Sequence, residues 1–136
     1  MRRILLPLAA TAVLLAGCTQ NVRNDSLIAT LNAYSGAVRW DGFQSGLQYV
    51  DPAVLKAHPV SDFDLQRYAQ LRVSDYDDGN GPVALNDHEV QQTVRISFID
   101  NHTQVERSII VHQLWRYDAK ARHWWLESEP PNPDQN

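Results

Sequence analysis

The chain has 136 residues, of which 12 are Lys or Arg and 16 are Asp or Glu, giving a formal net charge of −4. This acidic balance argues against a nucleic-acid-binding protein, which needs a basic stripe, and against electrostatic attraction to anionic lipid. The single cysteine excludes an intramolecular disulfide, so the fold has to be held together by its apolar core.

A basic start followed by an apolar stretch opens the chain. Arg2 and Arg3 precede a largely apolar segment over residues 4–15. Its 12 residues are too few to cross a bilayer, for which a helix needs about 20 residues. A segment of this build is typical of a signal peptide, which is removed from the mature protein.

The apolar segment ends in Leu14-Leu15-Ala16-Gly17-Cys18. This stretch resembles the bacterial lipobox, in which small residues precede a cysteine that is lipidated and becomes the first mature residue. The resemblance implies that Cys18 is acylated, and two or more acyl chains anchor a protein stably in a bilayer. Because Thr19 and Gln20 follow in place of Asp, it also implies an outer-membrane lipoprotein that faces the periplasm. The alternative is an ordinary secretory signal that happens to contain a cysteine.

Removal of residues 1–17 leaves 119 residues, about one domain. The removed segment carries two arginines, so 10 basic and 16 acidic residues remain, a net charge near −6. We expect a lipidated tether over residues 18–24 and an α+β domain over residues 25–128. The Pro-rich, polar residues 129–136 are expected to form a disordered tail.

Helical periodicity occupies the first half of this domain. From residue 25, apolar side chains recur at steps of four, three and four, which predicts one face of an amphipathic helix: Leu27, Leu31, Tyr34 and Val38. Asp41 is expected to cap a second helix that ends at about Val50. Asp51-Pro52 predicts the start of a helical turn over residues 53–57, and His58-Pro59 predicts its end.

The period then changes to two, which predicts strands. They are expected at residues 62–76, 90–98, 105–117 and 122–127, with intervening turns at 77–82, 100–103 and 118–121. Helices followed by an antiparallel meander predict an α+β fold, with N-terminal helices packed on one face of a curved antiparallel sheet of about four strands. Leu31 of the helix and Ile109 of the sheet are expected to be buried.

The last predicted hairpin positions three tryptophans. If Tyr117 pairs with Arg122, then Trp115 faces Trp124 on the core side and Trp125 points outward. Because an exposed aromatic side chain can mark a partner surface, Trp125 is a candidate interaction residue for an envelope protein. The alternative is an aromatic cross-strand pair that only stabilises the hairpin.

Two stretches resemble parts of a known fold: Tyr34…Trp40-Asp41…Tyr49-Val50-Asp51-Pro52, and Leu114-Trp115-Arg116-Tyr117-Asp118 with His123-Trp124-Trp125-Leu126. They look like the helical half and the last hairpin of the nuclear transport factor 2-like and cystatin-like rolls. The resemblance covers residues 25–128 and implies a long helix lying across a curved sheet. Such rolls host isomerases, dehydratases and plain binding modules, so the fold does not set the function.

No motif for catalysis or metal binding stands out. The acidic turn at residues 75–81 lacks the ligand spacing of a calcium loop, and the five histidines are scattered. His112, on the predicted third strand, is expected to be a partly buried structural residue rather than a catalytic base. Because a nucleophile elbow and a phosphate loop are also missing from the sequence, we expect no metal, no cofactor and no catalytic residue.

Two functions stay open. The first is a non-enzymatic lipoprotein that acts as a binding or envelope-assembly module. The second is a small cavity enzyme of the ketosteroid isomerase or dehydratase kind, which needs a carboxylate in an apolar pocket, with Asp41 and Asp62 as the nearest candidates. A closed pocket with a carboxyl group of raised pKa favours the enzyme. The binding module is favoured by an interior filled with side chains: Leu27, Leu31, Phe43 and Trp115.

Overall fold

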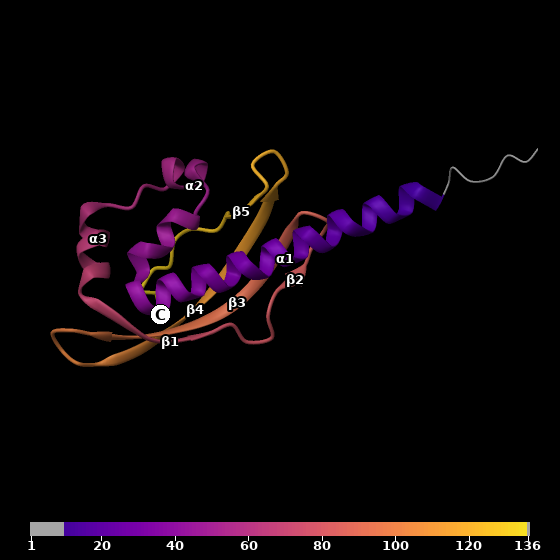
Figure 1. Cartoon of the computed structure of the whole chain (residues 1–136). Coiled ribbons are helices and arrows are strands. Elements are labelled where there is room, and N and C mark those ends of the chain that lie inside the picture. Colours follow the sequence, from indigo (N-terminus) through magenta and orange to yellow (C-terminus); the bar gives the residue numbers. More distant parts are fainter. Residues whose placement is uncertain (1–9, 136) are drawn as a thin grey trace, which may run out of the picture.

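In the computed structural model of the chain, helices cover the concave face of a curled antiparallel sheet (Figure 1). The structure describes residues 10–135, and side chains from Val22 onward; the predicted basic start and the side chain of Cys18 lie outside this description. The elements follow in this order: α1 (Ala10–Asp41), the 3₁₀ helix η1 (Phe43–Tyr49), α2 (Pro52–Ala57), α3 (Asp62–Ala69), β1 (Leu71–Asp77), β2 (Val83–Ala84), β3 (Glu89–Asp100), β4 (Glu106–Asp118) and β5 (His123–Leu126).

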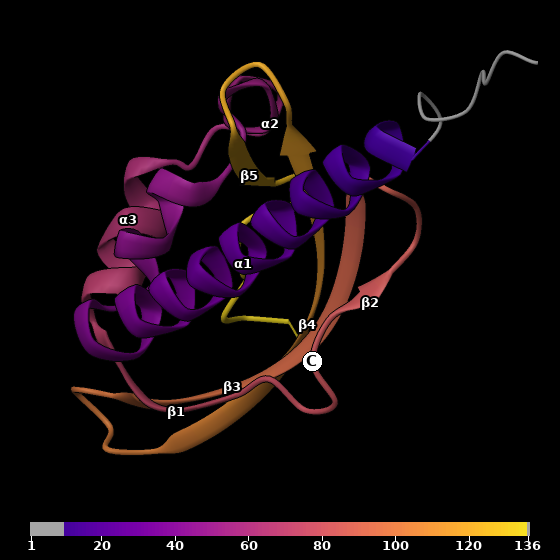
Figure 2. The same cartoon turned by 45° about the vertical axis from the view of Figure 1, so that its right-hand side comes forward.

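The helix α1 is longer than expected and lies across the concave face of the sheet (Figure 2). Its backbone is helical through residues 18–24, where we expect a tether. Leu27, Tyr34 and Val38 are buried as predicted, whereas the prediction for Leu31 is wrong, because this residue is only partly buried. Within the described residues, no helix combines the length and the apolar character needed to span a membrane.

The chain turns sharply after α1. Asp41 does not cap a second helix, because it is the last residue of α1. Gly42 follows with φ 91°, a conformation that glycine adopts without a steric penalty, and starts η1. Asp51 caps α2 as predicted, since its side chain accepts a hydrogen bond of 2.8 Å from the N–H of Ala53.

The first half of the strand predicted over residues 62–76 is instead the helix α3. A capping box starts it: Ser61 Oγ accepts from the N–H of Asp64, and Asp64 Oδ2 accepts from the N–H of Ser61, each at 3.1 Å. Leu65 and Tyr68, three residues apart, turn toward the core. The alternation of apolar and polar residues in this stretch predicted a strand. The spacing of three residues between Leu65 and Tyr68 is instead that of one helix face.

The sheet has the order β1-β3-β4-β5, and the two-residue strand β2 also pairs with β3. All neighbours are antiparallel, and the pairing of β3 with β4 runs from Glu89–Arg116 to Ile99–Glu106. The prediction of an α+β fold with helices on a curved antiparallel sheet is confirmed. A bulge in β1 after Val73 shifts the register, so that Tyr76 reaches the concave side.

The last hairpin differs from the prediction by two residues. Tyr117 pairs with Trp124 and not with Arg122, because the four-residue turn lies one residue later than expected, at residues 119–122. In this turn, Asp118 Oδ1 accepts hydrogen bonds from the N–H groups of Lys120 and Ala121, and Arg122 has a positive φ of 50°. A shift of two residues keeps every side chain on its predicted face. Trp124 is accordingly buried, and Trp125 is partly exposed on the convex face.

Trp115 consequently has a different partner from the predicted one. It pairs with Leu126 in the register, and its ring packs against Tyr34 of α1 with centroids 5.2 Å apart. The ring of Trp124 packs against Tyr117, also with centroids 5.2 Å apart. Ile109 is 4% exposed, which agrees with its predicted burial.

The Pro-rich residues 129–135, for which we expect disorder, run along the molecule beyond β5. The N–H of Glu127 still donates to the carbonyl of Leu114, and Arg107 then donates to the carbonyl of Pro133. Tyr68 of α3 donates to the carbonyl of Pro131 at 2.7 Å. Because proline offers a carbonyl acceptor but no N–H, this segment satisfies donors on α3 and β4 without forming a strand of its own.

Candidate functional site

Aromatic side chains fill the space between α1 and the sheet. Tyr34, Phe43 and Trp115 are each at most 1% exposed. Phe43 packs on Phe98 and Tyr68, with ring centroids 5.6 Å and 5.4 Å away. Of the four side chains expected to fill this interior, only Leu31 is not buried. The middle of the roll is therefore a packed core.

Two glutamines interrupt this apolar core. Gln92 and Gln113 are cross-strand partners of β3 and β4 and are 5% and 2% exposed. Gln113 is satisfied, because its Nε2 donates to Tyr76 OH at 3.1 Å and its Oε1 accepts from Trp115 Nε1 at 3.2 Å. Gln92 Oε1 is buried and has no hydrogen-bond partner in the described structure. A buried acceptor without a partner lowers the stability of the fold. A ligand that donates a hydrogen bond to Gln92 Oε1 would remove this cost.

The tyrosine hydroxyls near the glutamines stay protonated at neutral pH. Burial raises the pKa of Tyr34, and it raises the pKa of Tyr76 to about 12. A neutral hydroxyl can donate as well as accept, so Tyr76 can accept from Gln113 and still donate. Among the side chains that the structure describes, this interior therefore holds hydrogen-bonding groups but no group that ionises near neutral pH.

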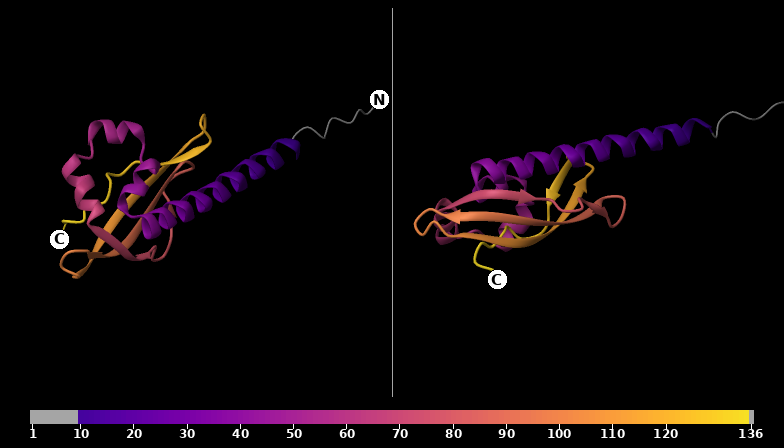
Figure 3. Two further views of the ribbon diagram at one scale, coloured as in Figure 1. Left: turned by 60° about the vertical axis from the view of Figure 1, so that its left-hand side comes forward. Right: turned by 90° about the horizontal axis from the view of Figure 1, so that it is seen from below.

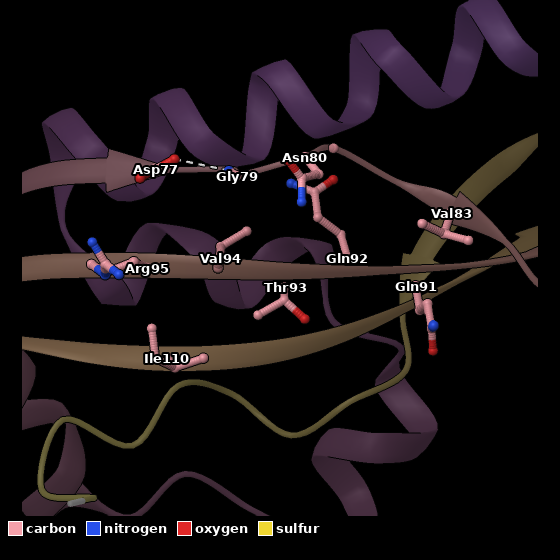
Figure 4. Close-up of a pocket in the computed structure, with 11 residues that line it drawn as sticks. Asp77, Gly79, Asn80, Val83, Gln91, Gln92, Thr93, Val94, Arg95 and Ile110 are labelled. Atoms are coloured by element: carbon pink, nitrogen blue, oxygen red, sulfur yellow. Dashed lines mark hydrogen bonds between the residues drawn. The ribbon is translucent and has the colours of Figure 1, made fainter.

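A gap in the sheet opens beside Gln92. The pairing of β1 with β3 ends at Arg95 and that of β2 begins at Gln91, which leaves three residues of β3 without a strand partner on this side. The loop 78–82 passes over the gap and borders an open hollow of about 340 Å³, which we call the edge pocket (Figure 4). In Figure 4, the side chain of Gln92 extends toward Asn80 of this loop.

The edge pocket is lined by six polar and three apolar side chains: Asp77, Asn80, Gln91, Gln92, Thr93, Arg95, Val83, Val94 and Ile110. Asp77 already accepts from the N–H of Gly79 at 2.8 Å. The pocket is open to solvent and offers amide, hydroxyl and backbone groups. Such a lining can bind a small polar molecule by hydrogen bonds, but it lacks the apolar enclosure that raises the pKa of a catalytic carboxyl group.

The residues considered for acid–base chemistry lie elsewhere. Asp41 and Asp62 are exposed at helix ends. His112 is exposed on the convex face, not partly buried, and its Nδ1 lies 3.0 Å from Thr93 Oγ1. No group of three or more metal-ligating side chains occurs within the described residues.

Among the described residues, the carboxyl group of Glu127 has a raised pKa, and it is not in a closed pocket. Burial and the neighbouring Asp51 raise the pKa of Glu127. Arg116 donates to Glu127 Oε1 at 2.9 Å and to Asp51 Oδ2 at 3.1 Å. This cluster joins the cap of α2 to β4 and the end of β5, so its geometry is that of a structural clamp.

Trp125 lies where the sequence predicts, on the convex face opposite Arg116 in the register. It is partly exposed, and its ring meets the edge of His123 with centroids 4.2 Å apart. Two further exposed aromatic residues were missed, and the first, Phe63 in α3, is 71% exposed. Trp40, at the end of α1, is 77% exposed and stacks with the guanidinium of Arg39, which lies 4.3 Å from its ring centroid.

The two glutamines were also missed by the sequence analysis, although a signal was present. In β3, Gln92 stands between Val90 and Val94, and in β4, Gln113 stands between Val111 and Trp115, each on the apolar face of its strand. A polar residue inside an otherwise apolar alternation indicates a buried polar group.

No family model matches this chain. The comparisons with curated proteins and with solved structures found no match either. The function therefore has to be inferred from the residues, the fold and the geometry of the site.

Proposed function

We propose that the chain is a lipid-anchored protein of the bacterial cell envelope, whose α+β domain binds a partner rather than catalysing a reaction. The Leu14–Cys18 stretch supports the anchor, because it resembles the site at which lipoproteins are acylated. Thr19 and Gln20 after the cysteine favour the outer membrane, with the domain facing the periplasm.

The packed interior is the observation that carries the choice between binding and catalysis. Isomerases and dehydratases built on rolls of this type need a carboxyl group and a hydrogen-bond donor inside an apolar pocket. Here Tyr34, Phe43 and Trp115 occupy that space, and the buried polar side chains of the described core are Gln92, Ser97 and Gln113. An amide or a hydroxyl of this kind binds but does not exchange protons near neutral pH.

Labelling of cells with an alkyne fatty acid tests the anchor. The wild-type protein is expected to carry the label, and Cys18→Ala is expected to lose it and to accumulate as precursor or as soluble protein. Thr19→Ala is the matched control and should keep the label. A label that persists on Cys18→Ala would end the lipoprotein interpretation, because the chain has no other cysteine.

Trp125 is the proposed contact for an envelope protein. A photo-crosslinking amino acid at position 125 is expected to give a defined adduct with one envelope protein. The same amino acid at Arg72, an exposed position of the other edge strand β1, is the control and should not give that adduct. If both positions give the same adducts, or if neither gives any, Trp125 is not an interaction residue.

A further inference from the structure

Contacts at Arg23 fix the first part of α1 to the sheet. Trp124 Nε1 donates to the carbonyl of Arg23 at 3.3 Å, and Arg23 donates to the carbonyl of Asp87. The guanidinium of Arg23 also lies 5.4 Å from the ring centroid of Tyr117. From Arg23 onward, α1 therefore cannot move independently of the sheet.

The proposed acylation site is close to this fixed point. Cys18 precedes Arg23 by five residues, which span about 8 Å as the helix that the structure shows. Even if these residues were fully extended, they would reach only about 18 Å. The acyl chains on Cys18, which rest on the proposed function, would therefore hold Arg23 within this distance of the bilayer.

Two loops lie at the same end of the sheet as Arg23, and we call this the anchor end: residues 85–88 and residues 119–122. The register places them together, because Glu89 begins β3 opposite Arg116 and the N–H of Tyr117 donates to the carbonyl of His88 at 2.8 Å. Figure 3 shows α1 leaving the roll on the side where the β4–β5 turn lies.

The anchor end presents exposed apolar and cationic side chains, together with the exposed acidic side chain of Asp87. Val22 and Leu85 are 65% and 50% exposed, so apolar side chains face outward near Arg23 of α1. Lys120 and Arg122 are exposed in the β4–β5 turn. Cationic side chains near a membrane surface are attracted to lipid phosphates. Because the chain as a whole is acidic, this attraction orients the domain, and the acyl chains supply the binding.

We propose that the anchor end rests on the bilayer, with Val22 and Leu85 at the level of the lipid headgroups and with Lys120 and Arg122 beside lipid phosphates. The loop 101–105 between β3 and β4 lies at the opposite end of the roll (Figures 1 and 3). Because β4 has 13 residues and is curved, this loop is at most about 40 Å away from the anchor end. The domain thus stands upright and presents the β3–β4 loop away from the membrane.

Single added cysteines test this orientation, since acylation blocks the chain's own cysteine. Leu85→Cys and Thr103→Cys, both at exposed positions, are labelled with an environment-sensitive fluorophore in the acylated protein. The protein is then bound to phosphatidylethanolamine–phosphatidylglycerol vesicles that contain a lipid with a nitroxide on its headgroup. We expect the probe at position 85 to be quenched several-fold more than the probe at position 103.

The same variants in a Cys18→Ala background are the control, and neither probe should be quenched. Equal quenching at both positions in vesicle-bound protein, or stronger quenching at position 103, would overturn the orientation and leave the anchor intact. Failure of the wild-type protein to bind vesicles, together with a free thiol at Cys18, would overturn the anchor and the orientation together.

Discussion

The unpartnered Gln92 Oε1 gives a stability prediction that can be worked from the structure. A buried acceptor without a partner costs about 1–3 kcal/mol. Methionine has nearly the same length and volume as glutamine and needs no hydrogen bond, so Gln92→Met removes this cost without opening a cavity. We expect the free energy of unfolding to rise by about 1 kcal/mol, which corresponds to about 4 °C in Tm for a domain of this size.

Gln113→Met is the matched control across the sheet and should have the opposite effect. It leaves the buried Trp115 Nε1 without an acceptor, and it removes the hydrogen bond that Gln113 Nε2 donates to Tyr76 OH. We expect the free energy of unfolding to fall by about 2 kcal/mol. Urea unfolding followed by tryptophan fluorescence measures both variants under the same conditions.

The result that would refute this reasoning is a clear loss of stability in Gln92→Met. Such a loss would mean that Gln92 Oε1 has a partner after all, bound in the edge pocket beside it. Equal losses in the two variants would have the same meaning, because the two glutamines would then be equally well satisfied.

Three further predictions concern the core and an ion pair. Trp124→Ala should lower the free energy of unfolding by about 3–5 kcal/mol, and Trp125→Ala by much less; equal losses would mean that the convex face is also covered. Ile109→Ala should lower the free energy of unfolding by about 2–5 kcal/mol, and Ile110→Ala by far less, because Ile110 is 44% exposed. A larger loss for Ile110→Ala would mean that the opposite face of β4 is the buried one. The Asp100 carboxylate accepts a hydrogen bond of 2.9 Å from the guanidinium of Arg67, which lowers the pKa of Asp100. The stabilisation from this ion pair is therefore present above about pH 4 and is lost as the pH falls through the pKa of Asp100 in the folded protein. Asp100→Asn should therefore be less stable than wild type at about pH 6, and this difference should shrink toward about pH 2; a constant difference would contradict the ion pair.

The sheet could be predicted well because its strands obey one simple rule. The alternation along β3 and β4 places Val94, Ile96 and Ile109 on one face, and that face is buried. Even where the hairpin register was wrong, the error of two residues preserved the faces. The fold class therefore followed from periodicity alone.

Other features depend on interactions that periodicity does not contain. The helix α3 depends on the capping box of Ser61 and Asp64, whose side chains satisfy backbone groups that no hydrophobic pattern reports. The edge pocket depends on where β1 ends and β2 begins, which is a property of the pairing and not of either strand. That Gln92 Oε1 lacks a hydrogen-bond partner can be known only when its neighbours in space are known.

The contact between Arg23 and Trp124 joins residues that are 101 positions apart. Helix α1 packs on η1, β1 and β5, so its core face stays uncovered until these later segments exist. Trp124 and Leu126, both at most 2% exposed, belong to the last strand. Contacts of such long range are slow to form, because the loops between them have to close first. Helix α1 can therefore complete its packing only after β5, the last strand, has been made.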